Sequence, residues 1–306
     1  MSDISASADV STGALLAQEM VVPSRGRGWA RTLRQLSRNK GATLSLIILL
    51  LIVFVAVAAP AIAPYKPDEV VVTDRLQPPS PAHLMGTDQF GRDVFSRTLH
   101  GTRITLMFAL TAVFLSTIMG VIPGLIAGYS GGLLDVIIMR IVDIMLAFPG
   151  ILLALIVVAI LGVGLSQLIW AIAISYIPVY IRLVRGSVVA TKENMYVEAA
   201  RVVGCTNFRV MFRHILPNVV FPVMVTSTTA IAWAILSGTA LNFLGLGVRP
   251  PIPEWGADMA DGRNYLRMSW WITSGPGFAV MITILAVNLL GDWMASAMDP
   301  RLRQRL

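Results

Sequence analysis

The sequence has little charge. Asp, Glu, Lys and Arg make up 13% of its 306 residues, while hydrophobic residues make up 56%. A soluble globular domain is nearer a quarter charged, so these charges are too few to cover a water-facing surface of this size. The net charge of +7 forms no basic face for nucleic acid, because Lys and Arg gather in short segments between apolar runs. The composition therefore predicts a protein covered largely by membrane lipid, with no nucleic-acid partner.

Several chemically useful residues are also scarce. Cys205 is the one cysteine, which excludes a disulfide within the chain. A phosphate-binding P-loop needs Gly-Lys followed by Ser or Thr, and none of the lysines (Lys40, Lys66 and Lys192) follows a glycine. The chain also has no His-Glu-x-x-His zinc motif. We therefore predict no catalytic residue, no metal site and no cofactor in this chain, so that any ATP is hydrolysed by another one.

Long hydrophobic runs are abundant. A helix crosses the hydrocarbon of a bilayer in roughly 20 apolar residues. The first run, Ala42 to Ala63, carries no charge and lacks a convincing cleavage site, which predicts an uncleaved anchor. The third run is weaker, because Pro149 and Gly150 interrupt it. We predict an all-α, polytopic membrane protein with six transmembrane helices, at residues 42–62, 104–127, 144–162, 166–184, 217–239 and 274–296.

The distribution of positive charge predicts the orientation, because Lys and Arg are biased to the cytoplasmic side. With the N-terminus inside, the cytoplasmic segments contain twice as many Lys and Arg residues as the outer segments. Both termini are therefore expected in the cytoplasm, and residues 1–24 are expected to be disordered. The predicted parts are a cytoplasmic tail (1–40), the first transmembrane helix with a periplasmic segment (41–103), a five-helix core (104–296) and a cytoplasmic C-terminal tail (297–306).

Three glycines repeat every four residues along the second predicted span. Gly120, Gly124 and Gly128 therefore share one face of a helix. Small residues let helices approach closely in lipid. We expect this face to pack within the chain rather than to form a dimer contact.

The predicted cytoplasmic loop between the fourth and fifth spans is long. Residues 193–203 favour a helix, and Gly204 can supply the left-handed residue that ends it. A second short helix is expected at about residues 206–215. Pro217 then begins the fifth span, where its missing N–H costs nothing. The pattern predicts a helix, a turn and a helix lying against the cytoplasmic face.

A Glu-Ala-Ala triplet lies in the first of these helices, and its two alanines allow another surface to approach closely. The triplet, the glycine six positions after the glutamate and the Leu-Pro pair at the next span together resemble the EAA signature of binding-protein-dependent ABC importers. One departure is His214, where the wider family often has Ile, although Ile215 lies beside it. The resemblance implies that the loop, residues 192–217, is a coupling helix that docks on a separate ATPase subunit. The residues assigned to coupling are Glu198, Ala199, Ala200, Arg201, Gly204, Leu216 and Pro217.

Three further sequence blocks narrow the family. Residues 84–97, 244–256 and 298–303 resemble the C-type permease subunit of dipeptide, oligopeptide and nickel importers. The resemblance implies the type I ABC importer permease fold and alternating access in a bacterial cytoplasmic membrane. It also implies as partners a homologous B-type permease subunit, two ABC ATPase subunits holding ATP and Mg, and an extracytoplasmic substrate-binding protein. Di- and oligopeptides are the expected cargo, with nickel chelates and haem left open.

The predicted outer segments contain charged pairs with helical spacing. Residues 88–100 can form a surface helix, in which each pair lies four residues apart on one side. Residues 250–253 are too rich in proline to stay helical, which predicts a turn or re-entrant stretch near the outer surface. Two interpretations are open for this region, an outer gate and a docking surface for the binding protein. The residues assigned to it are Asp88, Arg92, Asp93, Arg97, Glu254 and Trp255.

A translocation path needs polar groups at membrane depth. No Asp, Glu, Lys or Arg lies mid-span, which suits a peptide carried as a zwitterion. The commoner fate of Ser and Thr in such helices is to bond to their own helix carbonyls or across packed helices. Asp135, Asp143 and Asp292 lie near cytoplasmic ends and are expected to be solvated or paired. The path candidates are Ser175, Tyr176, Thr226, Ser227, Thr228, Thr229 and Asn288.

Two rival functions fit parts of the sequence. Gly128-Tyr129-Ser130-Gly131 matches the short motif of rhomboid intramembrane serine proteases. That chemistry needs a base near the serine, yet His83 and His100 are expected across the membrane and His214 lies in the coupling loop. A self-contained channel or secondary transporter is the second rival, and it lacks a mid-span charge or visible repeats.

Overall fold

A computed structural model of the chain describes Leu36 and residues 39–298. This part is almost entirely helical, and its β-type pairing is an isolated bridge between Thr87 and Asp93. The chain divides into two compact units, Met1–Thr43 and Leu44–Leu306, and apart from residues 40–43 the features below belong to the second. The tails expected at 1–40 and 297–306 lie, except for a few residues, outside the described residues, as does the expected disorder of 1–24.

Five helices are long and apolar enough to cross a membrane, which confirms five of the six expected spans. Two of them extend well beyond the sequence-based bounds: α4 begins ten residues before position 104, and α7 ends at Lys192 rather than 184. Polar residues at these ends hide the helix from a hydropathy pattern. The five helices are α3 (Lys40–Ile62), α4 (Val94–Ser130), α7 (Leu165–Lys192), α10 (Leu216–Phe243) and α12 (Trp271–Met298).

The third expected span, 144–162, is wrong as a single helix. The structure has α5 (Gly132–Leu146) and α6 (Gly150–Leu161), which meet at an angle of 93°. Pro149 lies at the break with extended backbone, and a proline disfavours helical geometry in the residue before it. The pair is one broken span or a re-entrant loop, so the described residues hold five spans, or six if the pair is counted.

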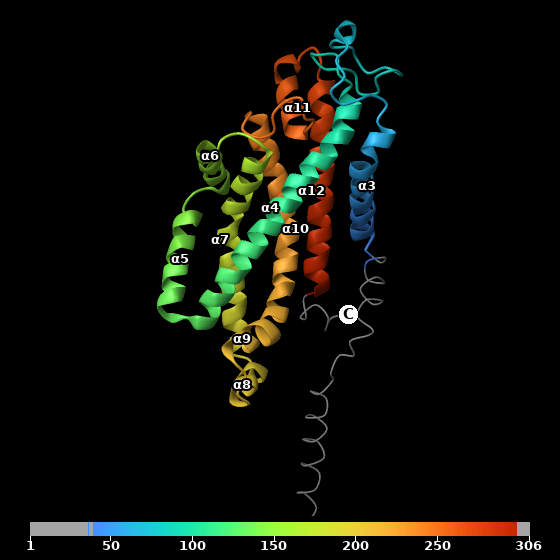
Figure 1. The fold of residues 1–306 in the computed structure, drawn as a ribbon. Coiled ribbons are helices and arrows are strands. Elements are labelled where there is room, and N and C mark those ends of the chain that lie inside the picture. The colour runs from blue at the N-terminus through green and yellow to red at the C-terminus, as the bar shows by residue number, and fades with distance from the viewer. Residues whose placement is uncertain (1–35, 37–38, 299–306) are drawn as a thin grey trace, which may run out of the picture. The chain divides into compact units, whose positions relative to one another are not determined.

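Helix α4 packs along the length of α7 (Figure 1). The three glycines make this close approach possible. A Cβ atom on Gly124 would lie 2.8 Å from the carbonyl oxygen of Ile181, and one on Gly128 would lie 2.7 Å from Cβ of Val188. The expectation of packing within the chain is confirmed. The main core lies between α4, α7 and α10 and includes Phe108, Ile172 and Ile235.

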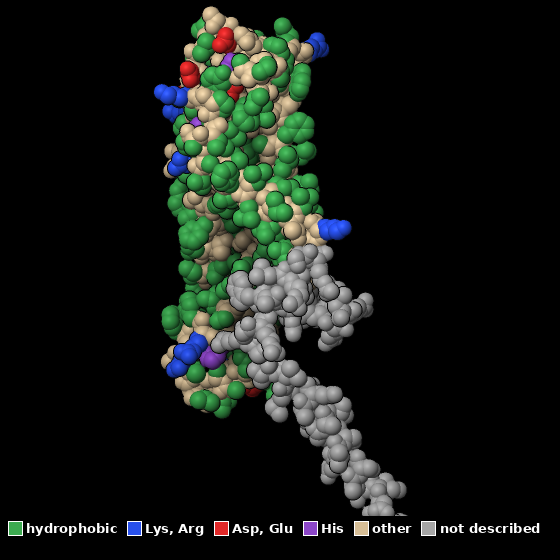
Figure 2. Space-filling view, turned by 90° about the vertical axis from the view of Figure 1, so that its right-hand side faces the viewer, with side chains coloured by type: hydrophobic (Ala, Val, Ile, Leu, Met, Phe, Trp, Pro, Cys, Tyr) green, Lys and Arg blue, Asp and Glu red, His purple; other side chains and the backbone are tan. Residues whose placement is uncertain are grey.

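The remaining short elements gather at the two ends of the helices (Figure 1). At one end, called here the α8 end, lie α8 (Met195–Val202) and α9 (Asn207–Arg209). At the other, called the α11 end, lie α11 (Trp255–Gly262), the 3-10 turns Val72–Asp74 and Arg263–Tyr265, and the loops of residues 63–93. Figure 2 shows one face of the molecule, where hydrophobic side chains cover the middle and most charged ones lie toward the ends.

Candidate functional site

The stretch from Lys192 to Pro217, called here the α8 segment, begins with a helix that ends as expected at Gly204. This glycine has a φ of +85°, which L side chains rarely adopt. Its N–H donates to the carbonyl of Arg201 (2.9 Å), and the N–H of Cys205 donates to the carbonyl of Ala200 (3.0 Å). These two bonds form the Schellman motif that closes a helix. The turn is therefore fixed by backbone geometry, and a Cβ at Gly204 would meet no atom within 4 Å.

The second half of the α8 segment differs from the prediction. The expected separate helix at 206–215 is a short α9 followed by a π-helical stretch, Val210–Ile215, that runs on into α10. No break separates it from the fifth span. The physical reason lies in Pro217, in the first turn of α10. Because proline has no N–H, it cannot donate the regular helical hydrogen bond to the preceding turn, and that turn widens to the π-helical form.

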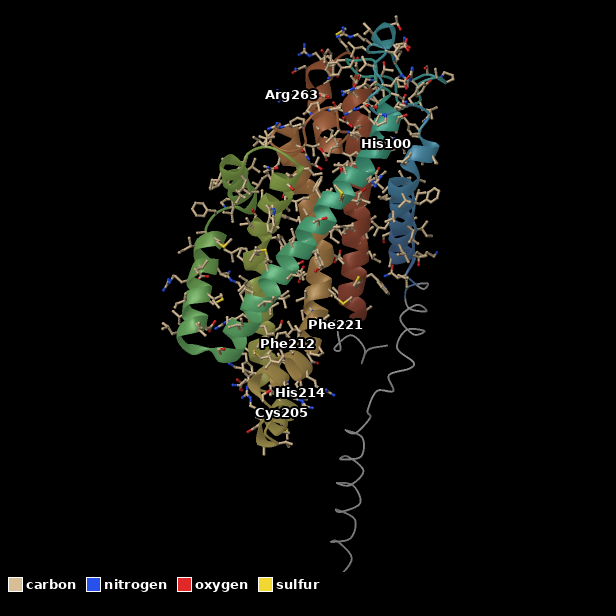
Figure 3. The ribbon with its side chains drawn as sticks, viewed as in Figure 1. His100, Cys205, Phe212, His214, Phe221 and Arg263 are labelled. Carbon is tan, nitrogen blue, oxygen red and sulfur yellow. The ribbon has the colours of Figure 1, made fainter. Side chains whose placement is uncertain are left out.

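The surface of the α8 segment exposes large apolar side chains among its polar and charged ones. Val197 is fully buried and anchors α8 to the rest of the chain. Around it, four large side chains have exposed fractions of 68% to 85%, whereas single-chain proteins bury contiguous apolar surface where they can. Sequence reasoning missed these four, and their signal was apolar residues flanking the Glu-Ala-Ala triplet. They are Met195, Val202, Val203 and Phe208. Figure 3 shows Cys205, Phe212 and His214 at this same end.

The residues assigned to coupling are spread over this surface. Glu198, Ala199 and Arg201 are exposed, as the expectation of a docking surface requires, and Ala200 is half-buried. Pro217 is exposed and Leu216 is half-buried. Geometry therefore places the triplet and the four apolar side chains on one accessible segment, while the coupling role itself stays a prediction.

At the α11 end, the expected surface helix over 88–100 is wrong. Residues 88–93 are a loop, and α4 begins at Val94 with Asp93 as its N-cap. The Asp93 carboxylate accepts from the N–H of Ser96 (2.7 Å) and contacts Nδ1 of His83 (2.9 Å). Asp88 accepts from the N–H groups of Phe90 (2.8 Å) and Arg92 (3.0 Å), which folds the loop back on itself.

The charged residues of this loop are buried, not exposed. Asp88, Arg92, Asp93 and Arg97 each have an exposed fraction of 4% or less. Arg92 pairs with Asp88 through Nε and with Asp261 through a terminal nitrogen (2.9 Å). The spacing of four residues predicted a pair between Arg97 and Asp93, but the structure does not form it. The set Asp88, Arg92, Asp93, Arg97, Asp258 and Asp261 is called here the charged cluster.

Arg97 joins α4 to α11. Its Nε donates to Asp258 Oδ1 (2.9 Å), a terminal nitrogen donates to the same oxygen, and another donates to the carbonyl of Pro67 (2.7 Å). Burial raises the pKa of Asp258 to about 6, although the Arg97 guanidinium opposes that shift. The partner lies 161 residues away in the sequence, which is why local spacing could not find it.

Glu254 and Trp255 are also buried, with exposed fractions of 0% and 1%. Glu254 is the N-cap of α11, accepts from the N–H of Ala257 (2.9 Å) and accepts from Oγ1 of Thr105 (3.1 Å). Burial raises its pKa to about 7 in spite of these bonds. The indole N–H of Trp255 donates to the carbonyl of Thr98 (3.0 Å). Together with the charged cluster these residues join α11 to α4, while the gate and the docking surface both stay predictions.

The path candidates do not form one group. A cleft of about 480 Å³ opens between α4, α10 and α12, and Ser227 and Thr228 line it. The other five do not line it. Ser175 is 4% exposed and donates to the carbonyl of Ala171 (2.7 Å), while Tyr176 stacks against the ring of Trp233 (5.0 Å between centroids). Of the remaining three, Thr226 on α10 and Asn288 on α12 are half-buried, and Thr229 on α10 is exposed.

Several polar side chains of the helices bond to nearby groups of the same chain. Ser227 and Thr228 also donate to carbonyls of their own helix, those of Val223 (2.8 Å) and Val225 (2.7 Å), the commoner fate expected for such residues. Asp135 pairs with Arg185 (2.7 Å) and Asp143 with Arg182 (2.5 Å), while Asp292 is exposed. These three outcomes confirm the expectation that the aspartates are paired or solvated.

Comparison with known proteins points to one family. Residues 120–304 match the family described as binding-protein-dependent transport system inner membrane component, and residues 28–79 match the N-terminal TM domain of oligopeptide transport permease C. The chain is 45% identical over 273 residues to the di/tripeptide transport system permease protein DppC of Pseudomonas aeruginosa, covering 87% of this chain and 90% of that one. It is 41% identical over 292 residues to the glutathione transport system permease protein GsiD of Escherichia coli, covering 95% and 96%.

A solved structure shares the fold. The chain is similar to one in the inward-facing MetNI methionine ABC transporter, with a TM-score of 0.53 and 18% sequence identity. The match covers 66% of this chain and 97% of that chain. It confirms the expected all-α, type I importer permease fold.

Proposed function

The chain belongs to the family of binding-protein-dependent transport system inner membrane components, and we propose that it is the permease subunit through which an ABC importer moves short peptides into a bacterium. The proposed cargo is a di- or tripeptide. The names of similar permeases support it, since they refer to dipeptides, di/tripeptides and glutathione. The cleft between α4, α10 and α12 has no charged side chain in its lining, which suits a zwitterion that carries no net charge. Nickel chelates and haem are the alternative cargoes.

The exposed apolar side chains of the α8 segment carry the proposal of energy coupling. Met195, Val202 and Val203 are each more than 80% exposed, and burying such side chains against a partner is favourable by about 25 cal/mol per Å². The partner proposed is an ABC ATPase subunit, which holds ATP and Mg. This chain itself is then a transport subunit rather than an enzyme, and two ATPase subunits drive one complex.

The proposal fixes the orientation. If the α8 segment docks an ATPase, the α8 end is cytoplasmic and the α11 end faces the periplasm, which agrees with the bias of Lys and Arg toward the predicted inner segments. Both termini are then cytoplasmic. A homologous B-type permease subunit completes the path, and an extracytoplasmic binding protein delivers the peptide to the α11 end. The two permeases alternate between conformations open to either side, and ATP shifts the population between them.

Reconstitution tests this function. The chain is co-purified with the B-type permease and the ATPase subunits encoded beside it, and the complex is placed in vesicles with ATP at the ATPase face. Radiolabelled alanyl-alanine is supplied outside with and without the binding protein. We expect uptake that needs both ATP and the binding protein and that stops when the P-loop lysine of the ATPase is replaced. Uptake by this chain without an ATPase contradicts the proposal and supports a self-contained carrier.

A further inference from the structure

We propose that Tyr129 is the positioning residue through which the α8 segment moves α4. Tyr129 is the last residue but one of α4, in the motif that resembles a protease signature. The proposal rests on the coupling function above and deepens it. It assigns to one side chain the transmission of force from the ATPase docking surface to a transmembrane helix.

Tyr129 contacts the α8 segment on both sides of its turn. The Tyr129 hydroxyl donates to Oδ1 of Asn207 (2.7 Å), at the start of α9. The guanidinium carbon of Arg201, in the last turn of α8, lies 5.3 Å from the centre of the Tyr129 ring, within the range of a cation–π contact. Gly204 lies between these two partners in the sequence. A displacement of the turn therefore reaches the Tyr129 ring from one helix and its hydroxyl from the other.

Helix α4 is built to carry such a displacement as a unit with α7. Lys192, the last residue of α7, donates from Nζ to the carbonyl of Gly128 (3.2 Å), one residue before Tyr129. At Gly124 and Gly128 the two helices are too close for a Cβ atom. A push on the end of α4 cannot be absorbed by sliding against α7, because close-packed interfaces have little room to deform.

The far end of α4 reaches the charged cluster. The helix is continuous from Val94 to Ser130 despite Pro123, and Arg97 in its first turn pairs with Asp258 of α11. Helix α4 thus contacts the α8 segment through Tyr129 and α11 through Arg97, a member of the charged cluster. This arrangement connects events at the two ends of the molecule through one rigid element.

Two substitutions separate the contacts. Tyr129→Phe keeps the ring beside Arg201 and removes the bond to Asn207, whereas Tyr129→Leu removes both. Ser130→Ala is the matched control, because Ser130 is the next residue and is exposed. The measurement uses the complete complex in vesicles and records alanyl-alanine transported per ATP hydrolysed, together with co-purification of the ATPase subunits. A merely structural role would change the yield or the assembly of the complex but not this ratio.

We expect the ratio to fall about tenfold in Tyr129→Leu and about threefold in Tyr129→Phe, as the loss of one or two weak polar contacts implies. Assembly and the ratio in Ser130→Ala stay as in the unchanged complex. An unchanged ratio in Tyr129→Leu overturns the inference while the proposed function stands. Absence of ATP-driven uptake in the unsubstituted complex overturns both. A fall of the ratio in Ser130→Ala as large as that in Tyr129→Leu shows that the effect is not specific to the Tyr129 side chain and overturns the inference.

A second design applies if Tyr129→Leu does not fold. Tyr129→Phe, Asn207→Ala and the double variant form a cycle on the hydrogen bond. If the bond transmits the displacement, the double variant loses no more of the transport-to-ATP ratio than the more impaired single variant. Losses that multiply show that the two residues act independently and overturn the proposal.

Discussion

The two ends of α4 differ in what they bury, since charged side chains are buried at the α11 end and large apolar side chains are exposed at the α8 end. At the α11 end, Arg92 and Arg97 are buried with exposed fractions of 4% and find their carboxylate partners within the chain. At the α8 end, Val202 and Val203 are more than 80% exposed and find no such cover. Buried charges are tolerated only when they are paired, and exposed apolar clusters indicate a partner.

This contrast separates a closed end from an open one. The buried charges of the α11 end are satisfied by ion pairs and caps of the same chain, although apolar side chains such as Val72 and Met268 are exposed there. At the α8 end, the described residues give Val202 and Val203 no comparable cover, and the proposed ATPase subunit is the partner that would bury them. Substitutions at the α11 end should therefore change the free energy of unfolding of this chain. Substitutions at the α8 end should change the amount of peptide transported per ATP hydrolysed.

Breaking the Arg97–Asp258 pair is expected to have the largest effect on stability. Arg97→Ala leaves a buried carboxylate without its counter-charge, which costs about 3–5 kcal/mol in the free energy of unfolding. Thermal unfolding of the purified protein in detergent measures the loss. Arg263→Ala, an exposed arginine at the same end (Figure 3), is the control and should change stability by no more than about 0.5 kcal/mol. Equal effects of the two would show that burial of the cluster is not what holds this end.

The pH dependence of stability is the next effect in size. Burial raises the pKa of Glu254 to about 7 in the folded protein, against about 4.3 in an unfolded chain. A raised folded pKa gives stability that is fully present below the unfolded value and is lost as the pH rises through the folded value, by up to about 4 kcal/mol. The unfolding temperature should therefore fall between about pH 4 and pH 7, the interval bounded by the unfolded and folded pKa values of this carboxyl.

Glu254→Gln is the matched variant for this measurement, because the amide keeps an acceptor for the Ala257 N–H and cannot ionise. It should remove most of the pH dependence. A smaller slope should persist from Asp258, whose pKa burial also raises, to about 6. If the unfolding temperature of Glu254→Gln depends on pH as steeply as that of the unsubstituted protein, Glu254 is not the group responsible for the pH dependence.

Two glycines with the same geometry give the smallest effect on stability and the sharpest comparison. Gly204 (φ +85°) and Gly245 (φ +78°) both lie in open turns, and each donates its N–H to a carbonyl three residues earlier. Proline fits neither, because its φ is negative and it has no N–H. Either substitution should therefore cost about 1–3 kcal/mol in the free energy of unfolding, and Gly204→Pro should in addition uncouple ATP hydrolysis from transport.

Gly245→Pro should leave this coupling intact. Gly245 follows the last turn of α10 at the α11 end, where Asn242 is 2% exposed and accepts from the N–H of Val248 (2.6 Å), so transport per ATP is retained in the molecules that fold. Comparable transport-to-ATP ratios in the two variants would remove the distinction between the two ends.

The sequence predicted the apolar architecture well because hydropathy is a local property. The five confirmed spans and the turn at Gly204 depend on residues that are neighbours in the chain. The helix bounds were less accurate, since α4 and α7 continue into polar residues such as Arg97 and Lys192. The third span failed because one proline within an apolar run bends it by 93°, an angle that composition does not encode.

The charged cluster could not be predicted from local spacing. Asp93 and Arg97 are four residues apart, which suggests a pair on a helix, but Asp93 is the cap of that helix and Arg97 finds Asp258 instead. The link between Tyr129 and Asn207 spans 78 residues and has no sequence signal of its own. Such contacts follow from how the helices pack, so only the folded chain reveals them.

Cross-linking from the α8 segment tests most directly whether this end is the surface on which a separate ATPase acts. In a Cys205→Ser background, Val203→Cys places a single thiol on the exposed turn, and Arg263→Cys places one at the α11 end as the control. With the complete complex and a short bifunctional reagent, the account predicts a product between Val203→Cys and an ATPase subunit, and none from Arg263→Cys. Modification of Val203→Cys in intact cells by a reagent that cannot cross the membrane, with no ATPase product, would contradict it.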